Sequence, residues 1–251
     1  MDITDKQLLR YKRHIMLPEI DVEGQQAITE AKVLVLGVGG LGSPAAMYLA
    51  AAGVGHLTLA DADNVELANL QRQIAYNEFM LEQQKTEACQ QTLRAINHEI
   101  DIKPVAQKLQ GELLQKTVAG VDIVLDCSDN LATRFEVNRV CFEYNKPLVS
   151  GAAIRWEGQI SVFIPQRQDS PCYQCFHQPG IELDQNCSNN GVVGPLTGVV
   201  GSMQAIEAIK LITGAGDIVP GRTLLFDALT MQWDSMQVPH RKHCEICGHR
   251  S

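Results

Sequence analysis

Four cysteines stand in two C-x-x-C pairs in the last third of the chain. The pairs are Cys172-Tyr-Gln-Cys175 and Cys244-Glu-Ile-Cys247. A two-residue spacer lets one tight turn present two thiolates to the same ion, and Zn²⁺ favours four thiolates in a tetrahedron. The spacing therefore predicts one closed structural zinc site, which would stabilise the chain and do no chemistry because no position is left open for water. Two disulfides, or reduced thiols without a metal, are the alternatives.

A glycine-rich segment earlier in the chain has the pattern of a nucleotide-binding loop. Gly37, Gly39 and Gly42 form G-x-G-x-x-G between the apolar run Lys32-VLVL and a helical pattern. Glycine lets the backbone approach phosphate closely, and the N-terminus of the following helix favours an anion. Asp61 closes the next apolar run, where a carboxylate can accept hydrogen bonds from ribose hydroxyls. This pattern predicts a nucleotide site, but a nicotinamide-dependent oxidoreductase would have it too.

Basic residues beyond Asp61 favour chemistry at phosphate. Arg72 and Lys85 follow in sequence, and Arg13 lies in an N-terminal helical pattern. Attack on an α-phosphate needs cations that stabilise its charged transition state, whereas hydride transfer places no new charge on phosphate. We therefore expect Arg72 and Lys85, with a contribution from Arg13, to hold phosphates. The alternative is that these residues are solvated surface charges.

An acidic segment, Asp126-Cys-Ser-Asp129-Asn130, follows the apolar run Val121-DIVL. Ligands of a doubly wound sheet bind at the carboxyl ends of its strands, so Asp129 is expected to face the nucleotide. A carboxylate there would repel ATP unless Mg²⁺ lay between them. The alternative role for Asp129 is the N-cap of the next helix. Both roles can coexist if either Asp129 or Asn130 caps the helix and the other binds.

The elements that must position these residues alternate as in an α/β protein. Beyond residue 150 the pattern changes to a strand of the antiparallel kind, a long irregular loop over 165–194, and a final helix and strand. We predict a Rossmann-like nucleotide-binding fold whose mostly parallel sheet is continued by antiparallel strands, in a single domain over 1–251 with halves 1–150 and 151–251. The expected strands are 32–37, 56–60, 99–105, 121–126, 146–152, 158–164 and 222–227, and the expected helices are 4–16, 43–52, 83–96, 131–144 and 196–213.

Composition excludes several classes of function. The net charge of −8 argues against nucleic-acid binding, which would need a basic face. The N-terminus carries charges throughout and lacks the apolar core of a signal peptide, and no stretch is long and apolar enough to cross a membrane. Eight cysteines without a signal peptide indicate reduced thiols in the cytoplasm.

Several segments together resemble the MoeB/ThiF family of sulfur-carrier adenylyltransferases, which are relatives of ubiquitin-activating enzymes. The resemblance is carried by RYKRHIMLPEIDVEGQ, VLGVGGLGSPAAMYLAAAGVG, NLQRQ, DCSDN, GAAIRWEGQI and the paired C-x-x-C. It implies that the C-terminal carboxylate of a small ubiquitin-like carrier ending in Gly-Gly attacks the α-phosphate of Mg·ATP. Carrier acyl-adenylate and pyrophosphate would form ahead of a thiocarboxylate. The implied cofactors are ATP, Mg²⁺ and Zn²⁺, and the implied assembly is a homodimer.

The resemblance also assigns roles to individual residues. Cys187 would form a transient covalent link to the carrier, although no positive residue nearby in sequence activates it, and an unreactive loop thiol is the alternative. The other assignments are Gly37, Gly39, Gly40, Gly42, Asp61 and Asp63 for the nucleotide, with Asp61 on the ribose; Asn69, Arg72 and Lys85 for its phosphates; Arg13 for the phosphates of the neighbouring subunit; Asp129 for Mg²⁺, with Asn130 beside it; and Cys172, Cys175, Cys244 and Cys247 for zinc.

The sequence gives mixed indications about the carrier. Gly151-AAIRWEGQISVF is similar to the molybdopterin branch of the family, and Asn186-CSNNGVVGP to the thiamine branch. We favour the molybdopterin-synthase small subunit, with the thiamine-pathway carrier as the alternative. Because the chain ends four residues after Cys247, we expect a separate sulfur donor of the cysteine desulfurase or rhodanese type. A nicotinamide-dependent oxidoreductase and a non-catalytic carrier-binding scaffold are the more remote alternatives.

Overall fold

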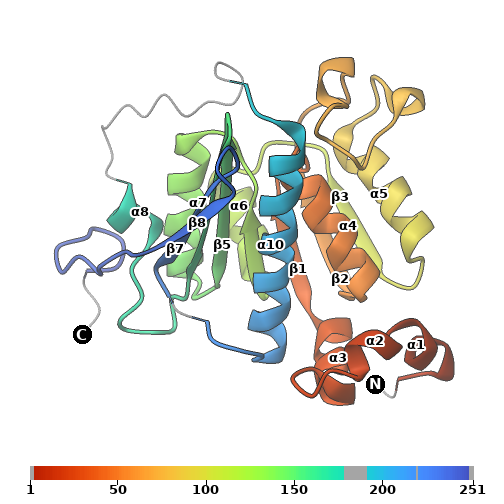
Figure 1. The fold of residues 1–251 in the computed structure, drawn as a ribbon, viewed down its shortest axis with the longest axis horizontal. Coiled ribbons are helices and arrows are strands. Elements are labelled where there is room, and N and C mark those ends of the chain that lie inside the picture. The colour runs from red at the N-terminus through yellow and green to blue at the C-terminus, as the bar shows by residue number, and fades with distance from the viewer. Residues whose placement is uncertain (1–2, 178–190, 219, 249–251) are drawn as a thin grey trace.

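The computed structural model describes residues 3–177, 191–218 and 220–248. Its strands form one eight-stranded sheet in the order β3-β2-β1-β4-β5-β6-β7-β8 (Figure 1). Strands β1 to β5 pair in parallel, and β6, β7 and β8 continue the sheet in antiparallel fashion. The strands are β1 (Lys32–Leu36), β2 (His56–Ala60), β3 (Asp101–Val105), β4 (Ile123–Asp126), β5 (Leu148–Ile154), β6 (Glu157–Phe163), β7 (Arg222–Asp227) and β8 (Gln232–Gln237).

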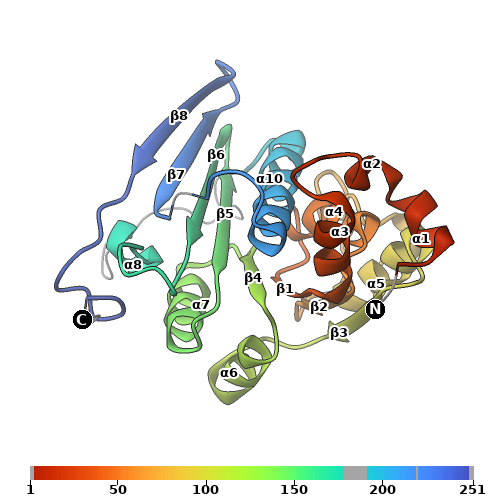
Figure 2. The ribbon, with the colours of Figure 1, turned by 90° about the horizontal axis from the view of Figure 1, so that it is seen from below.

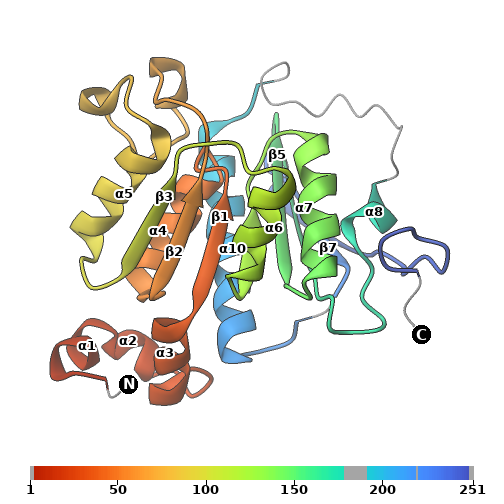
Figure 3. The same cartoon turned by 180° about the vertical axis from the view of Figure 1, so that it is seen from behind.

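Helices cover both faces of this sheet. Helices α4 and α10 lie on one face and α6 and α7 on the other (Figures 2 and 3). Among the described residues, no helix is long and apolar enough to cross a membrane. The helices are α1 (Asp5–Arg10), α2 (Lys12–Ile15), α3 (Asp21–Glu30), α4 (Gly42–Ala52), α5 (Lys85–Ile96), α6 (Gly111–Ala119), α7 (Leu131–Glu143), α8 (Tyr173–Phe176) and α10 (Gly194–Thr213), with short 3₁₀ turns at Leu67–Asn69 and Glu78–Met80.

The side chains of β1 are buried on both faces of the sheet. Successive side chains of a strand point to opposite faces. Val33 and Val35 therefore belong to the apolar cluster under α4, α5 and α10, whereas Leu34 and Leu36 belong to the cluster under α6 and α7. A continuous apolar run is the sequence pattern of such a strand.

The predicted fold class is confirmed, and the larger elements that the sequence did not indicate are α3, α6 and β8. All six residues of β8 are exposed, so that strand carries no alternating apolar pattern. The helix expected over 4–16 is broken at Tyr11 into α1 and α2. The irregular loop expected over 165–194 contains the four-residue helix α8.

Candidate active site and zinc centre

The strand order reverses between β1 and β4, and a cavity of about 320 Å³ lies beyond the carboxyl ends of these strands. This volume is within the usual range for small-molecule sites. Open α/β sheets bind ligands at such a switch point. The predicted site residues that line the cavity are Gly37, Gly39, Gly40, Asp61, Asp63, Arg72, Lys85, Asp129 and Asn130.

The glycine loop fits closely against its neighbours. Gly37 has a φ of +83°, and a Cβ there would lie 2.9 Å from the carbonyl oxygen of Cys127. Gly42 does not line the cavity: a Cβ on it would lie 1.8 Å from the Gly37 carbonyl oxygen. Gly42 is thus required for the turn that brings the N-terminus of α4 to the cavity, where its free N–H groups favour an anion.

Asp61 is oriented by the backbone around it. Its Oδ2 accepts a hydrogen bond from Val38 N at 2.9 Å, and its Oδ1 accepts one from Asp63 N, also at 2.9 Å. Burial raises the pKa of Asp61, and the positive charge of Lys85 opposes the rise. The carboxylate is therefore held in one orientation at the end of β2, where it can accept hydrogen bonds from ribose.

Two predicted basic residues line the cavity, Arg72 and Lys85, and Lys85 is the first residue of α5. Lys85 Nζ is 2.9 Å from Asp63 Oδ2, and Arg72 Nη1 donates to Ala68 O at 3.1 Å. Several lining residues were not predicted as site residues, among them the polar Gln73 and Lys108. Lys108 follows β3 in sequence, so its place beyond the carboxyl end of a parallel strand was the available signal.

Asn69 lies beside the cavity and does not line it. It is 9% exposed, and its Oδ1 has no hydrogen-bond partner among the described residues. A buried polar atom of this kind calls for an explanation, such as a bound water or ligand group.

The structure distinguishes the two neighbours Asp129 and Asn130. Asn130 caps α7, because its Oδ1 accepts a hydrogen bond from Thr133 N at 2.9 Å. Asp129 is exposed in the cavity wall. An exposed carboxylate facing bound phosphates fits Mg²⁺, which is commonly held by one or two carboxylates together with substrate oxygens.

A second cavity, of about 290 Å³, adjoins the first. It is lined by the hairpin of β5 and β6, by β7 and by Arg134 of α7. Leu41, Ser128 and Asp129 line both cavities. The first cavity therefore meets a second one, lined by both apolar and charged side chains, at the Ser128–Asp129 loop.

Arg13 is the one predicted phosphate-binding residue that lies far from this site. The ring of Tyr11, two residues before Arg13, packs on Gly53 at the C-terminal end of α4. The glycine loop lies at the opposite, N-terminal end of the same helix. The 11 residues of α4 span roughly 16 Å. Arg13 is exposed at this far end.

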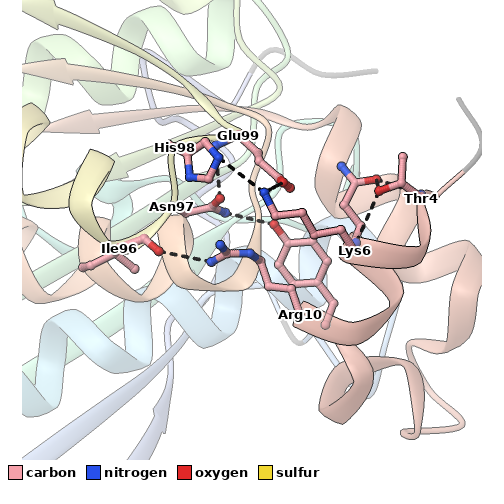
Figure 4. Close-up of polar contacts among 9 residues, drawn as sticks. Thr4, Lys6, Arg10, Ile96, Asn97, His98 and Glu99 are labelled. Atoms are coloured by element: carbon pink, nitrogen blue, oxygen red, sulfur yellow. Dashed lines mark hydrogen bonds and ion pairs between the residues drawn. The ribbon is translucent and has the colours of Figure 1, made fainter.

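The segment that carries Arg13 is tied firmly to the body of the protein. Tyr11 Oη accepts a hydrogen bond from the buried Asn97 Nδ2 at 2.9 Å. Arg10 Nη1 donates to Ile96 O at 3.1 Å, and Lys6 Nζ is 2.7 Å from Glu99 Oε1 (Figure 4). The main chain on either side of Arg13 is therefore held in place while its side chain points into solvent.

The four cysteines of the C-x-x-C pairs converge. All four sulfur atoms are buried and lie within 4.8 Å of one another. Individual Sγ–Sγ distances are 3.3 Å for Cys175–Cys247, 3.5 Å for Cys172–Cys244 and 4.0 Å for Cys172–Cys175. A tetrahedron with Zn–S bonds of about 2.3 Å has S–S edges of about 3.8 Å, whereas a disulfide needs about 2.05 Å. The geometry fits Zn²⁺ bound to four thiolates.

The remaining cysteines are core residues or lie outside the described chain. Cys89, Cys127 and Cys141 are buried, and burial raises the pKa of each thiol. These three cysteines are therefore packing residues. Cys187 lies outside the described residues, so its predicted covalent role stays a prediction.

A Rossmann-like sheet with a cavity at its switch point and a four-cysteine cluster beyond it defines a nucleotide-binding α/β protein whose cysteine cluster fits a metal ion. The ThiF family pattern matches residues 11–247. The chain therefore belongs to the ThiF family, and the predicted family is confirmed.

Relatives of known activity match nearly the whole chain. A molybdopterin-synthase adenylyltransferase from Escherichia coli (strain K12) is 45% identical over 247 residues, which cover 98% of this chain and 99% of that protein. The sulfur carrier protein ThiS adenylyltransferase of the same strain is 43% identical over 246 residues, which cover 98% and 97%. A crystal structure of E. coli MccB with MccA-N7isoASN has the same fold, with a TM-score of 0.84, 22% identity, and coverage of 98% of this chain and 76% of that one.

Proposed function

We propose that this protein adenylates the C-terminal glycine of a small ubiquitin-like sulfur carrier, as its relatives named for that activity do. The observation that carries the proposal is the meeting of the two cavities at Ser128 and Asp129. One cavity has the glycine loop and basic residues that suit ATP. The other adjoins it at Ser128 and Asp129, so the carboxylate of a glycine-ended tail bound there would lie beside the nucleotide phosphates.

The residues of the first cavity have distinct tasks in this reaction. Asp61 holds the ribose, and Arg72 and Lys85 stabilise the negative charge that develops on the α-phosphate. Asp129 would hold Mg²⁺, which would supply positive charge beside the phosphates. The carrier carboxylate oxygen forms a bond to the α-phosphorus, and the bond from that phosphorus to the bridging oxygen of pyrophosphate breaks.

Arg13 completes the site from a second subunit of a homodimer. Its exposed position at the far end of α4 favours a role in the partner's site over a role in its own. The four cysteines hold Zn²⁺ as a structural ion. Since one sheet runs through both halves of the chain, we treat 1–251 as a single domain. None of the seven described cysteines is in a disulfide, which fits a reducing cytoplasm.

The molybdopterin-synthase small subunit is our favoured carrier, and the thiamine-pathway carrier is the alternative. Relatives acting in the two pathways have almost equal identity to this chain, 45% and 43%. A separate protein, a cysteine desulfurase or a rhodanese, would then supply sulfur for the thiocarboxylate.

Carrier-dependent ATP–pyrophosphate exchange tests this proposal. Each carrier is supplied separately, and the matched control is the same carrier without its last two glycines. We expect exchange with the intact molybdopterin carrier and none with the truncated one. Exchange only with the thiamine carrier would reassign the pathway, and exchange with neither active carrier would contradict the adenylation activity.

A further inference from the structure

Gln73 is a buried residue of the first cavity whose side-chain oxygen is unpaired. It lines the cavity and is 4% exposed. Its Oε1 has no hydrogen-bond partner among the described residues. Buried polar atoms are nearly always paired, so an unpaired acceptor in a cavity wall calls for a donor that binds there. The roles given above to Asp61 and Arg72 do not account for it.

The main chain of Gln73 is fixed in place beside the glycine loop. Gln73 N donates to Asn69 O at 3.0 Å, and Tyr76 N donates to Gln73 O at 3.2 Å. The Tyr76 hydroxyl in turn donates to the carbonyl oxygen of Val38, in the glycine loop, at 2.7 Å. The turn that carries Gln73 is therefore joined to the loop that it faces.

The amide of Gln73 packs against the glycine loop through its nitrogen. A Cβ on Gly39 would lie 3.4 Å from Nε2 and 3.9 Å from Cδ of Gln73, whereas Oε1 is not within 4 Å of that position. The oxygen is thus the amide atom turned away from Gly39. An amide oxygen only accepts hydrogen bonds, so the group that pairs with it must be a donor.

The chemistry of ATP narrows the identity of this donor. Ionised phosphates only accept hydrogen bonds, so the donors of ATP are the two ribose hydroxyls and the adenine amino group. Asp61, which is assigned to the ribose, accepts a hydrogen bond from Val38 N through Oδ2. Gln73 packs on Gly39, the next residue of the loop. Since Asp61 and Gln73 lie against consecutive loop residues, a ribose hydroxyl is the donor expected at Gln73.

An uncharged acceptor suits this position. Asp61 already places one carboxylate in the cavity wall. A second carboxylate would add repulsion between like charges when a triphosphate binds. A glutamine oxygen accepts the same hydrogen bond without that repulsion.

We propose that Gln73 determines specificity for ribonucleotides: its Oε1 accepts a hydrogen bond from one ribose hydroxyl while Asp61 accepts one from the other. The inference rests on the proposed function, because it takes ATP as the nucleotide and Asp61 as its ribose ligand. It adds to the site a residue that discriminates between ATP and nucleotides lacking one hydroxyl.

Two variants of the full-length protein separate the acceptor from the packing of the side chain. Gln73→Met keeps a side chain of similar length and removes the amide. Gln73→Glu keeps an acceptor oxygen and adds a negative charge. Gln71→Met is the matched control, because Gln71 is an exposed residue of the same segment that lines neither cavity.

Calorimetric titration gives the affinity of each protein for ATP, 2′-deoxy-ATP and 3′-deoxy-ATP. We expect the wild type to bind each deoxynucleotide about tenfold more weakly than ATP, because each lacks one buried hydrogen bond. Gln73→Met should lose this difference for one of the two analogues and keep it for the other. Gln73→Glu should bind all three nucleotides more weakly and keep both differences. Gln71→Met should match the wild type.

A wild-type protein that bound either deoxynucleotide as tightly as ATP would overturn the proposal, and this result needs no variant. So would a Gln73→Met protein that kept both differences, because Gln73 would then serve only packing or bind only water. A wild-type protein that discriminated as expected but showed no carrier-dependent exchange would instead contradict the proposed adenylation and leave the role of Gln73 in place.

Discussion

The ammonium of Lys85 lies 2.9 Å from the carboxylate of Asp63, although the two side chains are 7% and 68% exposed. Lys85 is thus a nearly buried cation whose partner is largely in water. Buried charges are costly unless they are paired. The ion pair keeps Lys85 charged at the start of α5. Phosphates that bind there can interact with Lys85 together with Asp63 or in place of it.

Replacement of Lys85 by alanine is expected to lower the rate of carrier-dependent exchange by about 100-fold, because one preorganised group facing the developing charge is lost. Stability should change little, since the remaining Asp63 is mostly solvated. Initial-rate kinetics measure the effect, with Lys116→Ala on the exposed surface of α6 as the control. Equal rates in the two variants would remove Lys85 from the phosphate site.

Asp61 predicts a pH dependence of folding. Because burial raises its pKa, the folded protein holds a proton at this position more tightly than the unfolded chain, whose pKa is about 3.9. The contribution of Asp61 to the free energy of unfolding therefore falls as pH rises from the unfolded pKa through the raised folded pKa. Urea titrations across acidic pH, comparing wild type with Asp61→Asn, measure this contribution as the difference between the two proteins.

Over the same pH range, the affinity for ATP should rise with pH, whereas the contribution of Asp61 to stability falls. The ribose hydroxyls donate to a carboxylate, so ATP affinity is expected to weaken as pH falls through the folded pKa of Asp61. Calorimetric titration with ATP at several pH values tests this. A wild-type protein whose dependence equals that of Asp61→Asn would show that Asp61 does not hold the ribose.

The zinc centre predicts a joint loss of metal and stability. Cys172→Ser removes one thiolate, so zinc content should fall from about one ion per chain and the unfolding temperature should drop with it. Cys141→Ala is the matched control: this buried cysteine lies outside the cluster, so its loss should lower stability through packing and leave zinc unchanged. Full zinc occupancy in Cys172→Ser, by metal analysis, would show that the ligand set is wrong.

If Arg13 acts in the site of the partner subunit, a variant lacking Arg13 and a variant lacking Asp129 should complement each other in mixed dimers. Arg13→Ala and Asp129→Ala should each be inactive, whereas a mixture that exchanges subunits at random should regain about a quarter of wild-type activity, because half of the dimers contain one intact site. The assay is pyrophosphate exchange after subunit exchange. A mixture as inactive as its components would place Arg13 outside the partner's site.

Most of the fold could be predicted because its strands and loops carry local signals. The apolar run of β1 followed by Gly37 indicates a buried parallel strand and a phosphate loop within a few residues. No such signal marks β8, whose residues are exposed on both faces. Its pairing with β7 depends on the completed sheet.

The site also contains residues that the sequence indicates and residues that only the folded structure reveals. Asp61 and Asp129 could be predicted from their places at strand ends. Lys108, which follows β3, had a signal of the same kind. Gln73 had none, because only the folded chain brings it to the cavity wall.

Adenylate formation on the carrier tests the central claim most directly. Enzyme, Mg·ATP and the molybdopterin-synthase small subunit are mixed in a single turnover, and intact-mass spectrometry reads the carrier before and after hydroxylamine is added, with Asp129→Ala as the inactive control. We predict a carrier heavier by one adenylyl group that hydroxylamine converts to the hydroxamate, only with the wild-type enzyme and only with an intact Gly-Gly terminus. If both this carrier and the thiamine carrier keep their original mass while the enzyme binds ATP, the adenylation account is contradicted.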